Sequence, residues 1–389
     1  MPTVANLAAN PFFATPAQRT ALARERFFER GERPLGLVSE PVIQSWHRCL
    51  AAGHRPEATP VFDPVTRTQL RAALDRNHAL LQAAGPEIDQ LDTMLAGTAC
   101  KTVLTDRHGT IVRASPPVGG GRGVLDIAGR VGVNLGEHSL GSTAPGITTA
   151  AGALVTVSGG EHFYGALREV HCAAAPIRDG LGQLVGVLDV SIEGRTFAFD
   201  ALALVRLSAA AIENRLLARQ ARGRVLLRFQ ASPRLLGTPL EGLAAVDAQG
   251  RVAWVNAAGL SLLDQPADEP SAYELEALFG LSLPVLLGCT REAAPQPHRL
   301  PSGLQVYLQA SLGDEAGAAP APDDAVMRPA PAAPAPPPAP SAEASLNAMS
   351  RQAIDAALVR SRGNISAAAR ALGVSRGLLY RRLRQRSGA

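Results

Sequence analysis

The Ala-, Pro- and Gly-rich segment of residues 313–343, which contains PAPAAPAPPPAP, constrains the fold of this chain more than any other feature. Proline and alanine at this density cannot build a core, so we expect an extended, disordered and semi-rigid tether. The tether separates residues 344–389 from the rest of the chain. The chain has 389 residues and a hydrophobic content of 46%. This is ample for buried cores in two to four domains.

Beyond the tether, residues 344–389 have the pattern of a helix, a sharp turn and a second helix. Residues 365–372 form a short Ala-rich helix pattern, and Gly373 is free to adopt the positive φ of a tight turn. Ser375 can cap the second helix, in which Leu379 and Leu383 share one face. We therefore predict an all-α helix-turn-helix with a polar face opposite the leucines.

The charge of this segment indicates DNA binding. It holds nine arginines and one acidic residue, Asp355, so its net charge is +8, whereas the whole chain carries +4. A recognition helix enters the major groove by its N-terminal end, and a clustered positive charge attracts phosphate. On this basis the residues expected at DNA are Ser375, Arg376, Gly377, Tyr380 and Arg381, with Arg384 on the same exposed face. The alternative is a solvated basic helix at a chain end.

The stretch GNISAAARALGVSRGLLYRRL also resembles the helix-turn-helix of the Fis family, which occurs at the C-terminus of many bacterial enhancer-binding activators. The resemblance implies DNA-proximal roles for Asn364, Ser366, Ser375, Arg376, Tyr380, Arg381 and Arg382. It further implies that a helix over residues 346–360 pairs with its twin in a homodimer, which places two recognition helices about one DNA turn apart.

Several classes of protein are disfavoured by what the sequence does not contain. The single lysine, Lys101, lies in an apparent strand, so there is no P-loop lysine, and the glycine-rich run over residues 119–123 is interpreted as a flexible loop. The four cysteines are scattered without C-x-x-C spacing, which predicts reduced thiols and neither a disulfide framework nor a zinc site. No run of about 18 apolar residues occurs, which predicts a cytoplasmic protein without a membrane partner.

Before the tether the chain alternates helical and strand patterns. Residues 1–37 are predicted to form a partly ordered N-terminal extension, and a helix is predicted from Ser39 to Gly53. A longer helical pattern over residues 66–95 is expected to break near Gly85 and Pro86. A short helix over residues 139–151 and a strand over residues 153–157 come next.

Three hairpins of a common type are predicted, because a D-x-x-G turn joins two apolar runs at residues 106–109, 179–182 and 247–250. They imply antiparallel sheets in an α+β multidomain fold.

The motifs IQSWHRC, TVLTDRHGTIV, GEHSLGSTAPG and HCAAAPIRDGLGQLVGVLDVS resemble, in order and spacing, the GAF-type sensor domain of acetoin-catabolism sigma-54 activators. The resemblance covers residues 38–222. It implies a GAF-like antiparallel sheet with flanking helices, built to enclose a small effector.

We predict an apolar pocket in this domain whose hydrogen-bonding residues are Ser139, Ser142, Thr143 and His171. A transition-metal site formed by Glu137, His138, Glu161, His162, His171 and Cys172 is the alternative. It lacks the usual ligand spacing. We therefore expect Glu161 and His162 to brace a loop, Cys172 to pack in the core, and no metal to bind.

A helix predicted from Asp200 to about Arg228 leaves this domain, either as a lever or simply as a cover for the sheet. The stretch LEGLAAVDAQGRVAWVNAAGLSLL then resembles the start of a PAS domain, which we place at residues 223–312 with its closing strand over residues 304–312. No cofactor is expected there, because no cysteine or histidine is placed as in a flavin or haem PAS motif.

The sequence thus predicts an effector-responsive transcriptional regulator that binds double-stranded DNA and a small organic molecule. The AAA+ ATPase of the related activators has no room between the PAS-like domain and the helix-turn-helix. Three modes of action then stay open: repression, recruitment of RNA polymerase with another sigma factor, and modulation of a full-length activator. A ligand-free architectural or adaptor protein is one alternative. An enzyme is another, although no G-x-S-x-G or H-E-x-x-H motif and no paired cysteine ligands occur.

Overall fold

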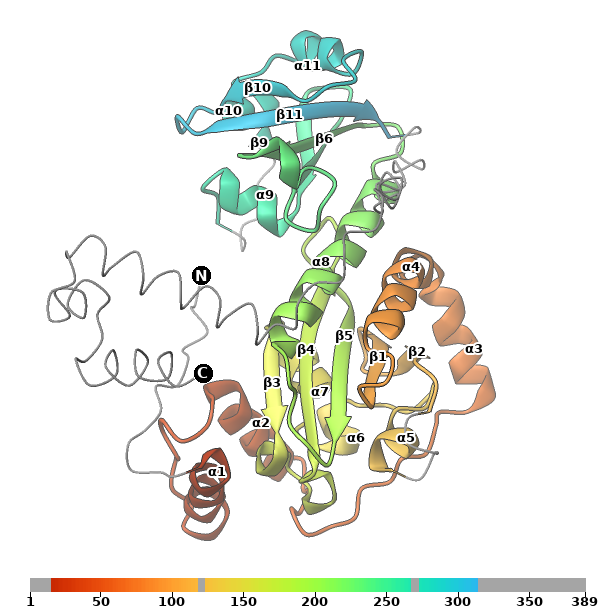
Figure 1. Cartoon of the computed structure of the whole chain (residues 1–389), viewed down its shortest axis with the longest axis vertical. Coiled ribbons are helices and arrows are strands. Elements are labelled where there is room, and N and C mark those ends of the chain that lie inside the picture. The colour runs from red at the N-terminus through yellow and green to blue at the C-terminus, as the bar shows by residue number, and fades with distance from the viewer. Residues whose placement is uncertain (1–14, 118–122, 267–272, 314–389) are drawn as a thin grey trace, which may run out of the picture. The chain divides into compact units, whose positions relative to one another are not determined.

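The computed structural model describes residues 15–117, 123–266 and 273–313. These residues form two antiparallel sheets, each accompanied by helices (Figure 1). The predicted α+β fold with antiparallel sheets is confirmed. The predicted tether beyond Gly313 and the predicted helix-turn-helix lie outside the described residues.

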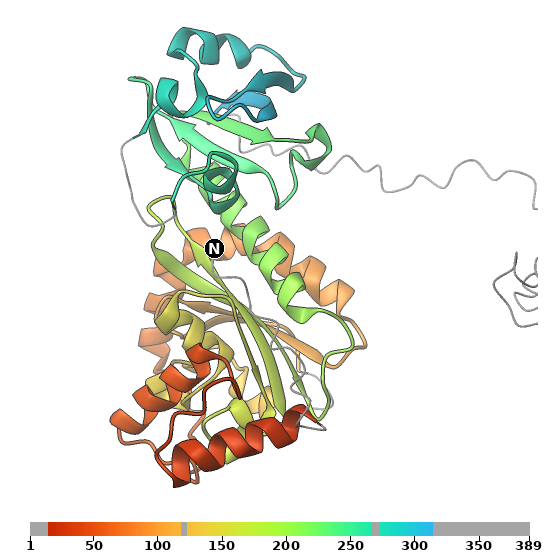
Figure 2. The same ribbon diagram turned by 90° about the vertical axis from the view of Figure 1, so that its left-hand side faces the viewer.

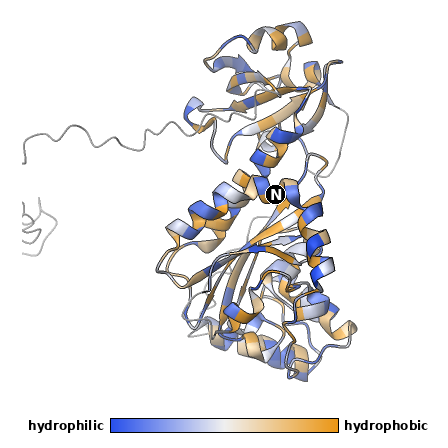
Figure 3. Cartoon of the chain, turned by 90° about the vertical axis from the view of Figure 1, so that its right-hand side faces the viewer, coloured by the Kyte–Doolittle hydropathy of each residue, from blue (hydrophilic) through white to orange (hydrophobic). Residues whose placement is uncertain are grey.

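The first sheet has five strands, and every neighbouring pair is antiparallel. In spatial order they are β2 (Ile111–Ala114), β1 (Cys100–Asp106), β5 (Leu184–Glu193), β4 (Val170–Arg178) and β3 (Val155–Ser158). All seven residues of β1 are buried, because the sheet is covered on both faces. The central strands are correspondingly apolar along most of their length (Figure 3).

Helices pack on both faces of this sheet (Figure 2). On one face, α4 (His78–Met94) and α8 (Ala201–Gln220) bury Ile88 and Ile212 against the strands, and α3 (Arg67–Arg76) packs beside α4. On the other face lie α2 (Glu40–Ala51), α6 (Glu137–Leu140) and α7 (Ala144–Ala151), where Trp46 and Ile147 are fully buried. The second face also carries α5 (Val124–Ala128) and two single turns, η2 (Gly159–Glu161) and η3 (Gly165–Leu167).

The three predicted D-x-x-G hairpins are confirmed, and they share one geometry. In each, the aspartate Oδ1 accepts two backbone N–H groups at 2.9 Å, from the residues two and four positions later. The glycine that ends each turn has a φ between +73° and +83°, which other residues rarely adopt. These turns fix the register of β1–β2, of β4–β5, and of β7 (Gly242–Val246) with β8 (Arg251–Val255).

The second sheet has six antiparallel strands. In spatial order they are β10 (Gln296–Arg299), β11 (Gln305–Leu312), β6 (Val225–Gln230), β7 (Gly242–Val246), β8 (Arg251–Val255) and β9 (Tyr273–Glu274). One face packs on α9 (Ala257–Leu262), α10 (Leu275–Phe279) and α11 (Leu283–Cys289) around Phe229 and Phe279. On the other face, Trp254 packs against Leu217 of α8. A turn, η4 (Pro233–Leu235), lies between β6 and β7.

The start of the chain is more ordered than the sequence analysis predicted. The described part of the predicted extension forms α1 (Pro16–Arg24), one π-helical turn, η1 (Glu25–Glu29), and a loop to α2. Phe27 and Leu37 join the same core as Trp46, so packing shows no break between residues 37 and 38. The prediction underestimated this segment because its apolar residues contact a distant part of the chain.

Three predicted helices have different limits in the structure. The break in residues 66–95 falls at Asn77, whose side chain binds the carbonyl of Ala73, and α4 continues through Pro86. The helix predicted to reach Arg228 ends at Gln220, because residues 225–230 form the central strand β6. Strand β6 lies within residues 223–312, the range predicted for the second domain, and precedes its predicted hairpin. The predicted helix over residues 139–151 is two helices, because Gly141 has a φ of +62° between them.

Candidate functional site

A small cavity lies between the first sheet and the helices of its second face. Its volume is about 40 Å³, measured as the space open to the centre of a water-sized sphere. Since one water needs about 10–15 Å³ on this measure, the cavity has room for about three. It is lined by Lys101, Val103, Leu125, Ala128, Gly129, Leu135, Leu140, Thr143, Pro145, His162, Leu167, Val170, Cys172, Asp189 and Ser191. We call it the central cavity.

Three neighbouring strands supply the floor of the central cavity. Lys101 of β1 pairs with Ser191 of β5, which pairs in turn with Cys172 of β4. In the adjacent row, Val103 pairs with Asp189. Because side chains of directly paired residues point to the same side of a sheet, this register gathers five chemically different groups on one face.

Asp189 is the most unusual of these groups. Its side chain is only 1% exposed, and Oδ2 accepts a hydrogen bond from Ser191 Oγ at 2.6 Å. Its other oxygen, Oδ1, has no hydrogen-bond partner among the described residues. Burial raises the pKa of Asp189 to about 7, although the hydrogen bond from Ser191 opposes the rise. A buried polar atom that lacks a partner is rare and costly, so this oxygen is suited to a guest in the cavity.

Lys101, the only lysine of the chain, has its charge directed to the edge of the cavity. Its Nζ donates to the carbonyl of Ser115 at 3.3 Å and lies 3.5 Å from Asp126 Oδ1. The aliphatic stem passes so close to Gly129 that a Cβ there would lie 2.4 Å from Lys101 Cε. The lysine thus presents methylene groups to the cavity, while its ammonium group is engaged elsewhere.

His162 and Cys172 form part of the cavity wall. His162 is 1% exposed, and its Nδ1 lies 3.0 Å from the carbonyl of Gly159, to which it can only donate. Its Nε2 is then an acceptor, 3.6 Å from Cys172 Sγ. Burial lowers the pKa of His162 to about 4, and burial followed by the charge of Asp189 raises the pKa of Cys172 well above its usual value. Both groups are uncharged at neutral pH.

The loop that carries His162 is braced as the sequence analysis expected. Glu161 Oε2 accepts the backbone N–H of Ser158 at 2.8 Å, and His162 binds the carbonyl of Gly159. Within residues 15–117, 123–266 and 273–313, no three His, Cys, Asp or Glu side chains are grouped so as to hold a metal ion.

Of the four predicted pocket residues, Thr143 lines the central cavity. Its Oγ1 donates to the carbonyl of Leu135 at 2.8 Å and accepts from Gly146 N at 3.0 Å, so it caps α7. Ser142 is fully buried away from the cavity, 2.7 Å from Ser45 Oγ. Ser139 and His171 are half-buried and do not line the cavity. His171 is excluded by strand alternation, since its neighbours Val170 and Cys172 face the cavity.

The sequence analysis missed Asp189, Ser191 and Lys101. The available signal was a polar residue inside a strongly apolar strand. Asp189 and Ser191 are the polar residues of the otherwise apolar stretch VLDVS, and Lys101 begins a stretch with the pattern of a buried strand. Charged residues are almost never fully buried unless they are paired or functional, so these positions were the ones to examine.

The nine predicted DNA-contacting residues, from Asn364 to Arg384, lie outside the described residues. In the part of the chain that the structure describes, no helix is long and apolar enough to cross a membrane.

Two models of known protein families match parts of this chain. Residues 345–385 match the model of bacterial regulatory proteins of the Fis family, so the chain carries a Fis-type helix-turn-helix. Residues 14–216 match the model of the MimR N-terminal domain. This match covers more than half of the chain, which therefore belongs to the family defined by that domain.

Two curated relatives illustrate the similarity. The acetoin catabolism regulatory protein of Cupriavidus necator is 28% identical over 222 residues, which are 56% of this chain and 33% of that protein. The propane 2-monooxygenase operon transcriptional activator MimR of Mycolicibacterium smegmatis is 27% identical over 207 residues, which are 52% of this chain and 33% of MimR. The chain thus matches about a third of the length of each.

Among solved structures, the E. coli DhaR(N)–DhaL complex aligns with 70% of this chain and 99% of the matched chain. The identity is 16% and the TM-score is 0.44.

Proposed function

We propose that this chain is an effector-responsive transcriptional regulator. It binds double-stranded DNA through residues 345–385 and a small uncharged organic molecule in the central cavity. The observation that carries the proposal is Asp189 Oδ1, which lies buried at the floor of the central cavity and has no hydrogen-bond partner among the described residues. It offers one directional hydrogen bond in a space from which water can be displaced.

The groups around the cavity favour an uncharged ligand. Lys101 is engaged by Ser115 and Asp126, and His162 and Cys172 are neutral, so none of the three offers a free positive charge to an anion. The raised pKa of Asp189 makes it a poor counter-ion for a cation. Asp189 can donate to a carbonyl when it is protonated and accept from a hydroxyl when it is ionised. We infer a compound of roughly three to five non-hydrogen atoms with one hydroxyl or carbonyl group and an aliphatic body. The names of two relatives refer to acetoin catabolism and to a propane 2-monooxygenase operon.

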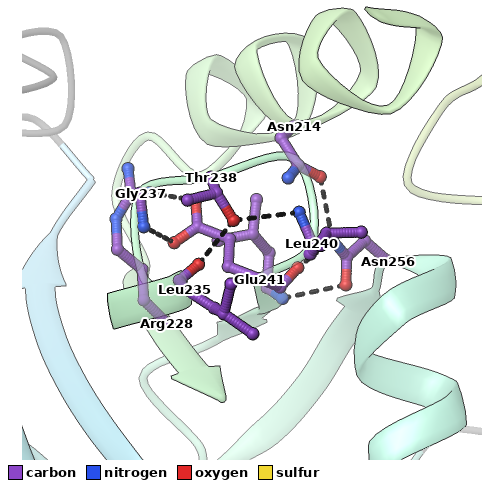
Figure 4. A network of polar contacts seen from close by, with 9 residues as sticks. Asn214, Arg228, Leu235, Gly237, Thr238, Leu240, Glu241 and Asn256 are labelled. Atoms are coloured by element: carbon purple, nitrogen blue, oxygen red, sulfur yellow. Dashed lines mark hydrogen bonds and ion pairs between the residues drawn. The ribbon is translucent and has the colours of Figure 1, made fainter. Parts of the chain in front are cut away.

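The route from the cavity to the second sheet consists of β4, β5 and α8. The β4–β5 turn lies against Trp254, so closely that a Cβ on Gly180 would be 2.7 Å from the indole ring. On α8, Asn214 Oδ1 accepts a hydrogen bond from Asn256 Nδ2 at 2.8 Å (Figure 4). Binding of a ligand to the floor strands would be transmitted to the β4–β5 turn and to Asn214 on α8. Coupling of this kind is usually about 1–3 kcal/mol.

Asn256 ties this contact into the second domain. Its Nδ2 also donates to the carbonyl of Glu241 at 2.9 Å, and its Oδ1 accepts the N–H groups of Leu243 and Gly259. Glu241 in turn pairs with Arg228 and accepts Gly237 N at 2.6 Å (Figure 4). One amide therefore joins α8, β7 and the start of α9, so a shift of α8 moves the second domain as a unit.

At the DNA end, we propose that a cytoplasmic homodimer presents two helix-turn-helix units to paired half-sites. The tether, residues 313–343, occupies the position where related activators would carry an ATPase. Regulation would then act through DNA occupancy, with contact to RNA polymerase or to a full-length activator, and without ATP hydrolysis.

Ligand-dependent stabilisation of the intact chain tests the cavity. The panel consists of uncharged alcohols, ketones and amides with about three to five non-hydrogen atoms, and a compound at 100 times its Kd should stabilise the protein by about 2.7 kcal/mol. Ala128→Val fills part of the cavity and should abolish the effect. The matched control Ala203→Val, at an exposed position of α8, should retain it. Equal responses of all three proteins, or no response of the wild type to any compound, would contradict the proposal.

A further inference from the structure

The loop over residues 158–163 forms one wall of the central cavity and is held from outside by two side chains near the start of the chain. Arg24 Nη1 donates to the carbonyls of Gly160 at 3.0 Å and His162 at 2.7 Å, and Nη2 donates to the carbonyl of Phe163 at 3.1 Å. Trp46 Nε1 donates to the carbonyl of Glu161 at 2.8 Å. All four consecutive carbonyls from Gly160 to Phe163 are therefore captured by residues more than a hundred positions earlier.

The surroundings of Arg24 are built for this contact. Its guanidinium lies 4.7 Å from the centre of the Phe28 ring and 5.8 Å from that of Trp46. Burial, followed by the charge of Arg168, lowers the pKa of Arg24 to about 10, so it stays protonated at neutral pH. Its positive charge is met by carbonyl dipoles and aromatic faces. The planar guanidinium of Arg24 can donate to three carbonyls while it contacts two aromatic rings, whereas the ammonium group of a lysine cannot.

Loop and helix also fit each other sterically. A Cβ on Gly160 would lie 3.1 Å from the Thr20 methyl group and 3.6 Å from Arg24 Cδ, so a side chain there would press on Thr20 and push it back by a few tenths of an ångström. The π-helical turn after α1 places Phe27 and Phe28 around Trp46 at ring distances of 5.0–5.2 Å. Helix α1, η1 and the loop thus form one packed unit beside the cavity.

We propose that Arg24 is a positioning residue for the central cavity. It holds the 158–163 loop so that His162 closes the wall over Cys172, and release of this clamp opens the cavity. Helix α1 is then the gate through which the effector site is regulated. The role in effector binding rests on the function proposed above, whereas the clamp itself does not.

Thiol accessibility in the intact chain tests the clamp without any ligand. Cys172 and Cys100 are both buried, but only Cys172 lies behind the loop, since Cys100 packs with Leu95 and Val190. The variants are Arg24→Met, Arg24→Lys and the control Arg30→Met, whose arginine pairs with Glu25 at the surface. Each is treated with methyl methanethiosulfonate, and modification of the two cysteines is followed in separate tryptic peptides by mass spectrometry.

In Arg24→Met, Cys172 should react at least tenfold faster than in the wild type while Cys100 stays protected. The rate of Cys172 modification in Arg24→Lys should lie between those of the wild type and Arg24→Met. The rate in Arg30→Met should equal that of the wild type. Unchanged protection of Cys172 would overturn the inference. A parallel rise at Cys100 would overturn it as well, because it would mean that Arg24 only supports global stability.

Ligand binding then separates this inference from the proposed function. A panel compound that stabilises the wild type should bind Arg24→Met at least tenfold more weakly and Arg30→Met normally. If no panel compound stabilises the wild type, the proposed function fails, while the thiol-modification result still decides the role of Arg24.

Discussion

Replacement of Asp189 by asparagine should change how the stability of the protein depends on pH. The pKa of Asp189 is raised by burial to about 7 in the folded chain, against 3.8 for the unperturbed group. The folded state therefore binds this proton more tightly than the unfolded state does. The associated stability is fully present below about pH 4 and is lost as the pH rises through about 7. The variant Asp189→Asn should have no such dependence, because an amide side chain does not titrate in this range.

The size of the effect can be worked out from the shift of about three pKa units. Linkage over that interval amounts to about 4 kcal/mol in total, of which about 1.5 kcal/mol is already lost at pH 5. Between about pH 5 and about pH 8, the wild type should therefore lose about 2–3 kcal/mol relative to Asp189→Asn. His162 and Cys172, whose pKa values are also shifted by burial, are present in both proteins, and their contributions largely cancel in the comparison.

Urea unfolding at the two pH values, followed by tryptophan fluorescence, measures the difference, since Trp46 lies in the core of the same domain. Asp75→Asn is the matched control, because it removes the same charge from an exposed position on α3. It should follow the wild type at both pH values. Equal losses of stability in Asp189→Asn and the wild type between the two pH values would refute the inference that the buried Asp189 carboxyl binds a proton in the folded chain.

Three further predictions concern the route to DNA and the DNA contact. Asn256→Ala leaves two buried backbone N–H groups unpaired and should destabilise the second domain by about 3 kcal/mol in urea unfolding. A loss of stability below about 1 kcal/mol would show that the Asn256 amide does not hold these segments together. Gly180→Ala should push the β4–β5 turn away from Trp254 and lower the free energy of unfolding by about 1–3 kcal/mol. Gly288→Ala is the control, because there is open space around Gly288, and it should be neutral or slightly stabilising. Equal effects of the two substitutions would argue against the close contact with Trp254. Arg381→Ala should weaken binding to a selected duplex and reduce the salt dependence of log K by about 1, as measured by fluorescence anisotropy; unchanged affinity and slope would remove this residue from the DNA interface.

Local chemistry explains which parts of the fold could be predicted from the sequence. The aspartate and glycine of each D-x-x-G turn determine the hairpin by contacts within five residues, so all three hairpins were predicted correctly. The Asp200 cap of α8 is equally local, since Oδ1 accepts Ala203 N at 2.9 Å. Strand β6 was not recognised, because it gains its partners from β7 and β11, the latter about eighty residues away. Long-range pairing overrides a helical pattern in this case.

The candidate site was predicted only in part for a related reason. Thr143 could be found from local capping chemistry, whereas Asp189 acquires its importance from the register of three strands, which no short motif encodes. His171 and Cys172 are adjacent in sequence but face opposite sides of β4. Alternation along the strand was therefore a better guide than proximity in sequence. The contribution of Arg24 could not be predicted, since its partners lie 136–139 residues further on.

If the proposed function is right, occupancy of the central cavity changes the affinity of the chain for DNA. The most direct measurement is the Kd of the intact chain for a duplex obtained by genome-wide selection, with and without a saturating panel compound, for the wild type and Ala128→Val. The Kd of the wild type should change by about 5–150-fold, equivalent to about 1–3 kcal/mol, and the Kd of Ala128→Val should not change. A wild-type Kd that stayed constant while the compound stabilised the protein, or an equal change in both proteins, would contradict the proposed function.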